Sequence, residues 1–117
     1  MSVQLPMIDG GTGQRFRIDC FTVPAAARAE FEAAVKRSMA FLETLEGFRG
    51  QVVVEKAGGP TAFDIVTIAA WESEEAVEKA GRAARAYYAG IGFNPSAAMA
   101  QWRVRAEMGE FRPWNAT

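Results

Sequence analysis

The segment that most constrains the fold is residues 61–71 (TAFDIVTIAAW), which is apolar on both sides of an extended chain. Successive side chains of a strand point to opposite faces, so Ile65 and Trp71 share one face while Val66 and Ile68 share the other. A strand that is apolar on both faces is covered on both faces. Helices of one small domain can cover a single face. We therefore expect a homodimer in which a second copy covers the other face, sheet to sheet.

The periodicity of the remaining segments predicts three more strands and two helices. Residues 15–23 (RFRIDCFTV) alternate as a strand whose buried face carries Phe16, Ile18 and Cys20, with Asp19 on the solvated face. Residues 25–45 and 74–89 show the three- and four-residue spacing of amphipathic helices. Residues 51–56 are expected to form a hairpin with the strand at 61–71 through the turn at 57–60. Residues 90–100 are expected to be a loop, and 101–111 alternate as the last strand.

The predicted order is strand, helix, strand, strand, helix, strand (βαββαβ), which is the split βαβ arrangement. The fold class is therefore α+β, ferredoxin-like, with a four-stranded antiparallel sheet. We expect one domain at residues 15–112, a flexible N-terminal arm at 1–14 and a C-terminal tail at 113–117.

The complete absence of histidine excludes several kinds of site. A chain without histidine cannot form a Ser-His-Asp triad, a histidine-ligated zinc site or a histidine-ligated haem. The single cysteine, Cys20, cannot form an intramolecular disulfide or a thiolate cluster, and it fits a reducing compartment. We expect no metal and no cofactor.

Charge and hydropathy narrow the range of partners. The formal net charge is −1 and the basic residues do not cluster, so no nucleic-acid partner is expected. The chain has no uninterrupted apolar run long enough for a transmembrane helix, and residues 1–14 lack the pattern of a secretory signal. These features predict a cytoplasmic protein without a membrane partner.

Two segments carry a resemblance to a known family. They are residues 42–50 (LETLEGFRG), followed by the valine-rich strand, and residues 70–76 (AWESEEA), where a strand meets a helix. Here the chain resembles the antibiotic biosynthesis monooxygenase (ABM) family of dimeric α+β barrels, over residues 16–111. The resemblance implies a ligand cavity between sheet and helices. Family members include cofactor-independent oxygenases of aromatic polyketides, quinol oxygenases and haem-degrading enzymes.

The haem-degrading branch has three residues that the chain matches only in part. That branch has an asparagine on the first strand, a tryptophan at the end of the third strand and a haem-ligating histidine ten residues later. Trp71 matches the tryptophan, whereas Gly81 stands at the histidine position and Cys20 at the asparagine position. We therefore expect no histidine-ligated haem degradation.

The resemblance also indicates which residues would form the site. Trp71 would be a wall or an indole N–H donor toward substrate, and Tyr87 and Tyr88 would offer phenol groups from the second helix. For each of the three, packing in the core is the alternative. The expected substrate pocket is lined by Cys20, Phe31, Gly81, Ala84 and Trp102.

The predicted function is a cofactor-independent monooxygenase that acts on an aromatic or quinol-type small molecule. In such enzymes the protein supplies a shaped apolar cavity and a few polar groups that stabilise a substrate anion. Two alternatives stay open: a non-catalytic, small-ligand-binding or stress-related dimer with the same cavity, and a domain whose main role is assembly.

Overall fold

The computed structural model of the chain describes residues 13–114, and its element order confirms the predicted α+β class. Strand β1 (Arg15–Thr22) is followed by a short 3-10 helix η1 (Ala25–Ala27) and by α1 (Arg28–Leu42). Strands β2 (Phe48–Glu55) and β3 (Ile65–Trp71) follow, then α2 (Glu74–Gly90), α3 (Pro95–Trp102) and β4 (Arg105–Phe111). All strand pairs are antiparallel, and the spatial order is β2-β3-β1-β4.

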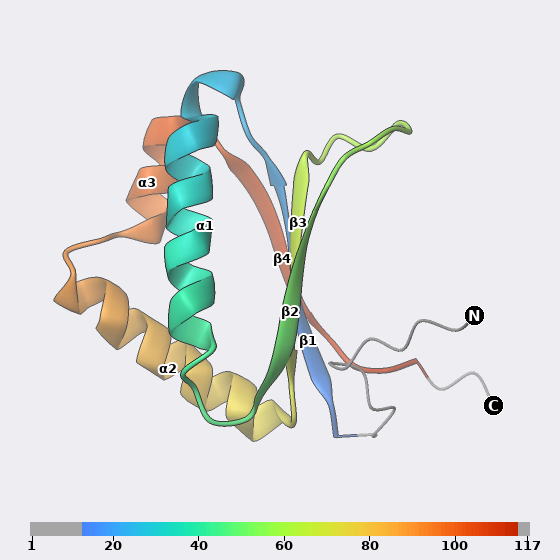
Figure 1. Cartoon of the computed structure of the whole chain (residues 1–117), viewed down its shortest axis with the longest axis vertical. Coiled ribbons are helices and arrows are strands. Elements are labelled where there is room, and N and C mark those ends of the chain that lie inside the picture. The colour runs from blue at the N-terminus through green and yellow to red at the C-terminus, as the bar shows by residue number, and fades with distance from the viewer. Residues whose placement is uncertain (1–12, 115–117) are drawn as a thin grey trace.

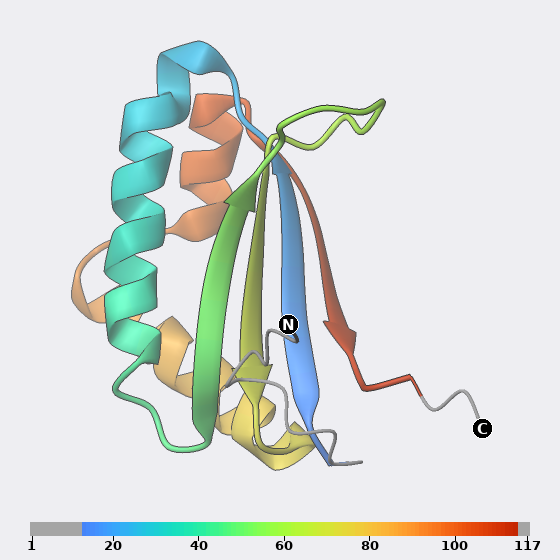
Figure 2. The ribbon, with the colours of Figure 1, turned by 45° about the vertical axis from the view of Figure 1, so that its right-hand side comes forward.

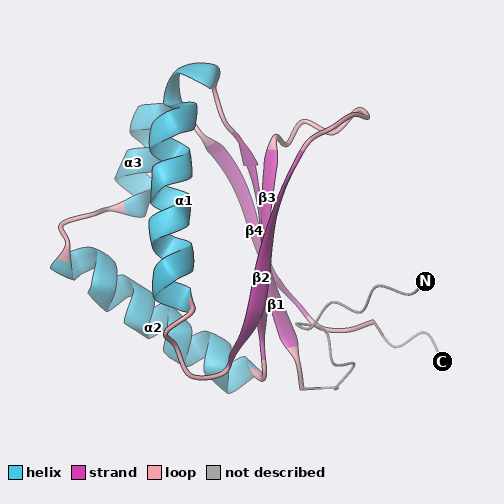
Figure 3. Ribbon diagram, viewed as in Figure 1, coloured by secondary structure: helices cyan, strands magenta, loops and turns pink. Residues whose placement is uncertain are grey.

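The molecule has two layers. Figures 1 and 3 show the three α-helices on one face of the twisted sheet, and Figure 2 shows the same arrangement from another side. No helix of residues 13–114 lies on the opposite face. On that open face Val54 and Phe111 are 46% and 51% exposed. Val66 and Ile68 also belong to it, because the register pairs them with Cys20 and Ile18.

The register of β1 corrects the expected orientation of this strand. Phe21 lies opposite Ile65 and Asp19 lies opposite Thr67. Phe21 and Ile65 are buried under the helices, at 7% and 3% exposure. Asp19 therefore faces the helices and Cys20 faces the open side, the reverse of what the sequence predicted. Alternation shows that two faces exist, but both faces of β1 carry apolar residues, so it does not identify the inner one.

The buried core is split into two clusters at opposite ends of β3. One contains Phe21, Phe31 and Ile65 and reaches α3. The other contains Trp71 and Val77 and joins β3 to α2. This division leaves space between the sheet and the helices in the middle of the domain.

Helix α1 is shorter than predicted, because it ends at Leu42 and residues 43–47 form a turn. Gly47 in this turn has φ +84°, and an added Cβ would come within 2.6 Å of the Ala76 Cβ. Only glycine accepts both this left-handed backbone and this close approach of α2.

Helix α3 begins within the segment predicted as a loop, extends two residues beyond it, and shifts the start of the last strand from 101 to Arg105. Local signals mark both of its ends. The Asn94 side chain accepts a hydrogen bond from the Ala97 N–H at 3.0 Å, and Pro95 occupies the first turn. Arg103 ends the helix in the left-handed conformation. As a result, Trp102 lies at the end of a helix and not on a strand.

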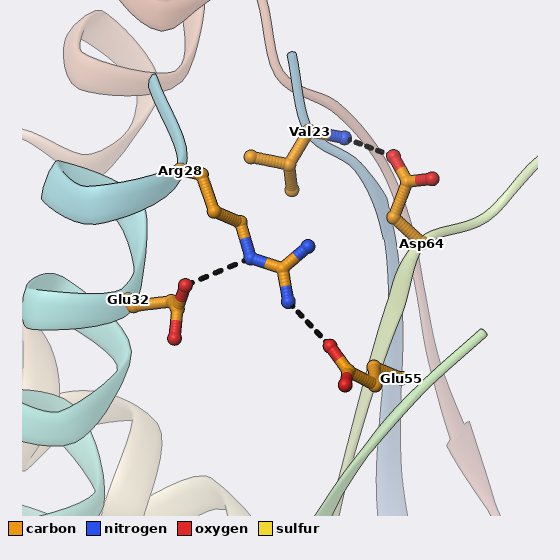
Figure 4. A network of polar contacts seen from close by, with 5 residues as sticks. All are labelled: Val23, Arg28, Glu32, Glu55 and Asp64. Carbon is orange, nitrogen blue, oxygen red and sulfur yellow. Dashed lines mark hydrogen bonds and ion pairs between the residues drawn. The ribbon is translucent and has the colours of Figure 1, made fainter. Parts of the chain in front are cut away.

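Polar contacts link the start of α1 to the upper end of the sheet (Figure 4). Arg28 donates to Glu32 at 2.9 Å and to Glu55 of β2 at 2.7 Å. The Asp64 carboxylate accepts the Val23 N–H at 2.7 Å. These bonds connect the β1–α1 segment to the β2–β3 hairpin.

Most of the predicted arm and tail lie outside the described residues. Within them, Gln14 is 2% exposed, so the ordered body begins before the expected boundary at residue 15. Among the described residues, no helix has the length and hydrophobicity needed to cross a membrane.

Candidate active site

A cavity of about 310 Å³ lies between the sheet and the helices. All four strands and all three α-helices contribute to its lining, which is mostly apolar. This volume is near the lower end for small-molecule sites. The space is therefore suited to one small, flat organic molecule.

Six of the eight predicted site residues line this cavity, and two do not. Tyr87 is directed elsewhere and stacks on Phe41, with ring centroids 4.2 Å apart. Cys20 faces the open side of the sheet, for the reason given above. The six that the structure brings together are Phe31, Trp71, Gly81, Ala84, Tyr88 and Trp102.

An ion pair on β1 supplies the charged groups of the cavity. Arg17 Nη2 donates to Asp19 Oδ1 at 3.3 Å, and both residues line the cavity. Burial raises the pKa of the Asp19 carboxyl, and the neighbouring Arg17 guanidinium offsets part of this effect. A carboxylate with a raised pKa is a better proton acceptor than an exposed one.

Two buried N–H donors at the cavity have no hydrogen-bond partner within the described part of the chain. They are Trp71 Nε1, on a side chain with 1% exposure, and Arg17 Nε. Buried polar groups are nearly always hydrogen-bonded in folded proteins, and an orphaned donor costs about 1–3 kcal/mol. These two N–H groups can donate to an acceptor atom in the cavity.

Three other polar side chains of the lining are engaged in hydrogen bonds. The Ser38 and Tyr88 hydroxyls lie 2.6 Å apart, which joins α1 to α2 and orients the Tyr88 ring. The Gln51 amide donates to the Met39 carbonyl oxygen at 3.1 Å. These bonds hold the walls of the cavity in place.

Aromatic rings form one wall at the α3 side. Trp102 packs edge-on against Phe31 at 6.5 Å and contacts Phe93 at 6.4 Å, and Phe93 contacts Tyr88 at 5.5 Å. The Trp102 indole N–H donates to Glu30 at 2.8 Å. These rings would lie against the edge or face of a flat ligand.

Sequence reasoning missed Arg17 as a site residue and placed Asp19 on the solvated face. A charged pair at i and i+2 on a strand is a signal, since such residues share a face with each other. Only the register shows that the shared face is the inner one. Ser38 and Gln51 gave no comparable signal.

Comparison with protein families assigns the chain to a family. The antibiotic biosynthesis monooxygenase family matches residues 18–85, more than half of the chain. The protein belongs to this family, and the family supports a monooxygenase-type function.

Solved structures with the same fold agree with this assignment. SnoaB, a cofactor-independent oxygenase from Streptomyces nogalater, is 26% identical with a TM-score of 0.64, and the match covers 89% of this chain and 96% of SnoaB. The haem degrader MhuD from Mycobacterium tuberculosis, solved with two haems in its active site, is 25% identical with a TM-score of 0.64, over 88% and 98% of the two chains. A protein from Shewanella loihica shares the fold at 15% identity and a TM-score of 0.66, over 92% and 100%. A search of curated protein sequences found no match.

The residues around the cavity do not fit a haem held by histidine or cysteine. The chain has no histidine, Gly81 is the cavity residue at the position of the histidine, and Cys20 lies outside the cavity. The Tyr88 hydroxyl is engaged by Ser38. Residues 13–114 also contain no group of three or more His, Cys, Asp or Glu that could hold a metal ion.

Proposed function

We propose that the protein is a cofactor-independent monooxygenase that oxidises an aromatic phenol- or quinol-type small molecule in this cavity. The observation that carries the proposal is the partly buried Asp19 carboxylate, with a side chain 21% exposed, beside Arg17 in a mostly apolar cavity. The geometry supplies a proton acceptor, unpartnered donors and room for one flat ring. SnoaB, with the same fold, is a cofactor-independent oxygenase.

The proposed reaction begins with proton transfer from an aromatic hydroxyl to Asp19. The oxygen–hydrogen electron pair stays on the ligand, and the electron-rich ring can then give one electron to molecular oxygen. Recombination of the two radicals forms a carbon–oxygen bond at a ring carbon that carries one hydrogen, and the proton held by Asp19 returns to the peroxide anion to give a hydroperoxide. Loss of water, which takes the hydrogen of that carbon and the outer oxygen, leaves a carbonyl. One oxygen atom enters the product and the other leaves as water, and the substrate supplies all the electrons.

The remaining lining residues serve this reaction by shape and orientation. Trp71 is proposed to contact the substrate through its indole N–H. Tyr88 is a wall whose hydroxyl is fixed by Ser38. Gly81 and Ala84 leave space for the ring on the α2 side. Tyr87 lies outside the cavity and is not proposed to touch substrate, in contrast to the sequence-based hypothesis.

The open face of the sheet is proposed to bind a second copy of the chain. Val54 and Phe111 are 46% and 51% exposed there, and Val66 and Ile68 lie between them on the central strands. An apolar face of this kind is rarely left open to water. The homodimer predicted from the sequence therefore remains part of the proposal.

Oxygen consumption with a panel of naphthols, anthrones and quinols tests the proposed activity. We expect turnover of at least one compound, strong loss in Asp19→Asn and Trp71→Phe, and no loss in Tyr87→Phe, the matched control outside the cavity. Tight binding of a panel member without oxygen uptake would instead support the non-catalytic ligand-binding alternative. Equal activity in all three variants would show that the site is elsewhere.

A further inference from the structure

The two unpartnered donors lie close together on the inner face of the sheet. Arg17 is opposite Ala69 on the neighbouring strand, and Trp71 is two residues further along the same face. Residues in this diagonal relation on adjacent strands are roughly 7–8 Å apart, within reach of long and aromatic side chains. One ligand group could therefore contact both side chains.

Both groups can only donate. The indole N–H has no acceptor capacity, and the guanidinium keeps its charge at every pH of interest. Arg17 already uses Nη2 to hold Asp19, at 3.3 Å, while its Nε remains without a partner. An atom that pairs with both donors must therefore be a hydrogen-bond acceptor. The positive charge of the Arg17 guanidinium favours an acceptor that carries negative charge.

The side chains beside Arg17 and Asp19 on the adjacent strands do not pair with the two unpartnered donors. Asp19 has Thr67 on one side and Met108 on the other, and neither is charged. Glu110, opposite Arg17 on β4, pairs with Arg15 at 3.8 Å. Asp19 itself would repel an anion unless it held a proton.

We propose that Arg17 Nε and Trp71 Nε1 form a donor pair that binds the oxide of an acidic aromatic hydroxyl, while Asp19 holds the proton taken from it. The ligand O–H bond breaks, the proton goes to the Asp19 carboxyl group, and the electron pair stays on the ligand oxygen. The inference rests on the proposed function for its ligand class and assigns Arg17 as a residue that determines specificity. The cavity thereby selects ionisable hydroxyl compounds over their ethers.

Spectroscopy without oxygen tests this selection independently of turnover. The probe is 4-nitrophenol, whose phenol and oxide forms absorb differently, with 4-nitroanisole as the ether that cannot ionise. At a pH below the ionisation of the free probe, we expect the ratio of oxide to phenol to rise at least about tenfold on binding, which corresponds to one pH unit. We expect 4-nitroanisole to bind more weakly than 4-nitrophenol.

Substitution of each proposed donor tests whether it binds the oxide. Arg17→Met and Trp71→Phe should each return most of the bound probe to the phenol form. Tyr87→Phe is the control, because Tyr87 stacks on Phe41 outside the cavity, and its ratio of oxide to phenol should stay that of the wild type. The Arg17 side chain is 39% exposed, so Arg17→Met should fold even if Trp71→Phe does not.

Three results would overturn the inference: no binding of 4-nitrophenol, binding with an unchanged ratio of the two forms, or equal effects of Arg17→Met and Tyr87→Phe. A shifted ratio in a protein that consumes no oxygen with any substrate would leave the donor pair intact and reject only the monooxygenase activity. The two proposals therefore fail in different experiments.

Discussion

A side chain added at position 81 should stabilise the protein, and a side chain large enough to fill the cavity should also impair ligand binding. Gly81 lies inside helix α2, and an added Cβ would meet only Arg85 Nη1, at 3.5 Å. Glycine in a helix interior is less stable than alanine by roughly 0.5–1 kcal/mol. Gly81→Ala should therefore raise the free energy of unfolding by about this amount. With a slope of about 2 kcal/mol per molar urea, the midpoint should rise by about 0.3–0.5 M.

Gly81→Leu extends this change into the ligand space. Leucine keeps the helical gain and places its side chain in the cavity of about 310 Å³. A ligand forced against it should lose about 1–3 kcal/mol of binding free energy, as in other overpacked sites. This loss corresponds to roughly a 5- to 150-fold rise in Kd, measurable by calorimetric titration of a naphthol that binds the wild type.

The matched control is Gly90→Leu at the end of the same helix. An added Cβ at Gly90 meets nothing within 4 Å, and Gly90 does not line the cavity. We expect its ligand affinity to equal that of the wild type. Unchanged affinity in Gly81→Leu would refute the assignment of the cavity as the ligand site. A loss of stability in Gly81→Ala would show that the space beside Gly81 is not open.

Three further predictions concern the base, the core and the open face. Asp19→Asn should lower kcat/KM by about 10²- to 10⁴-fold, and wild-type kcat/KM should rise with pH through the raised pKa of Asp19. Because the folded state keeps this proton at pH values where the unfolded chain has lost it, the unfolding free energy of the wild type should fall as the pH rises above about 4, the usual pKa of an aspartate, by more than that of Asp19→Asn. Urea titrations at a series of pH values would show this difference. Phe31→Ala removes a ring that is 4% exposed and should cost about 3–5 kcal/mol of unfolding free energy, and a cost below about 1 kcal/mol would contradict its place in the core. Val66→Glu should convert the dimer to a monomer in sedimentation velocity; a wild type that is already monomeric would reject the proposed interface.

The fold was largely readable from the sequence, because long periodic segments determine the strands and helices. The apolar residues of 61–71 predicted a strand, and the structure has β3 at Ile65–Trp71, between β1 and β2 in the sheet. Helix α3 was missed because its stretch lacks a polar face, although Asn94 and Pro95 mark its start. A prediction that gave the capping residues more weight than the periodicity would have placed a helix here.

The site was less predictable, because it depends on which face of β1 is inner. Trp71 and Gly81 could be placed from family resemblance and helical spacing. Asp19 could not, because a charged residue on a strand is normally solvated and the sequence contains no sign of a cavity beneath it. Because the two faces of β1 are the reverse of those predicted, Cys20 lies on the open face of the sheet, outside the cavity. Pairing of β1 with two neighbours is non-local information, so the orientation becomes visible only in the assembled sheet.

The most direct test is to locate a bound aromatic hydroxyl compound by crystallography, with a brominated naphthol whose bromine gives an unambiguous signal. The account predicts the ring between α2 and the sheet, with its oxygen within hydrogen-bond distance of Arg17 Nε and Trp71 Nε1. A ring bound on the open face of the sheet, or in the shallow hollow beside Arg85 and Asn94, would contradict it.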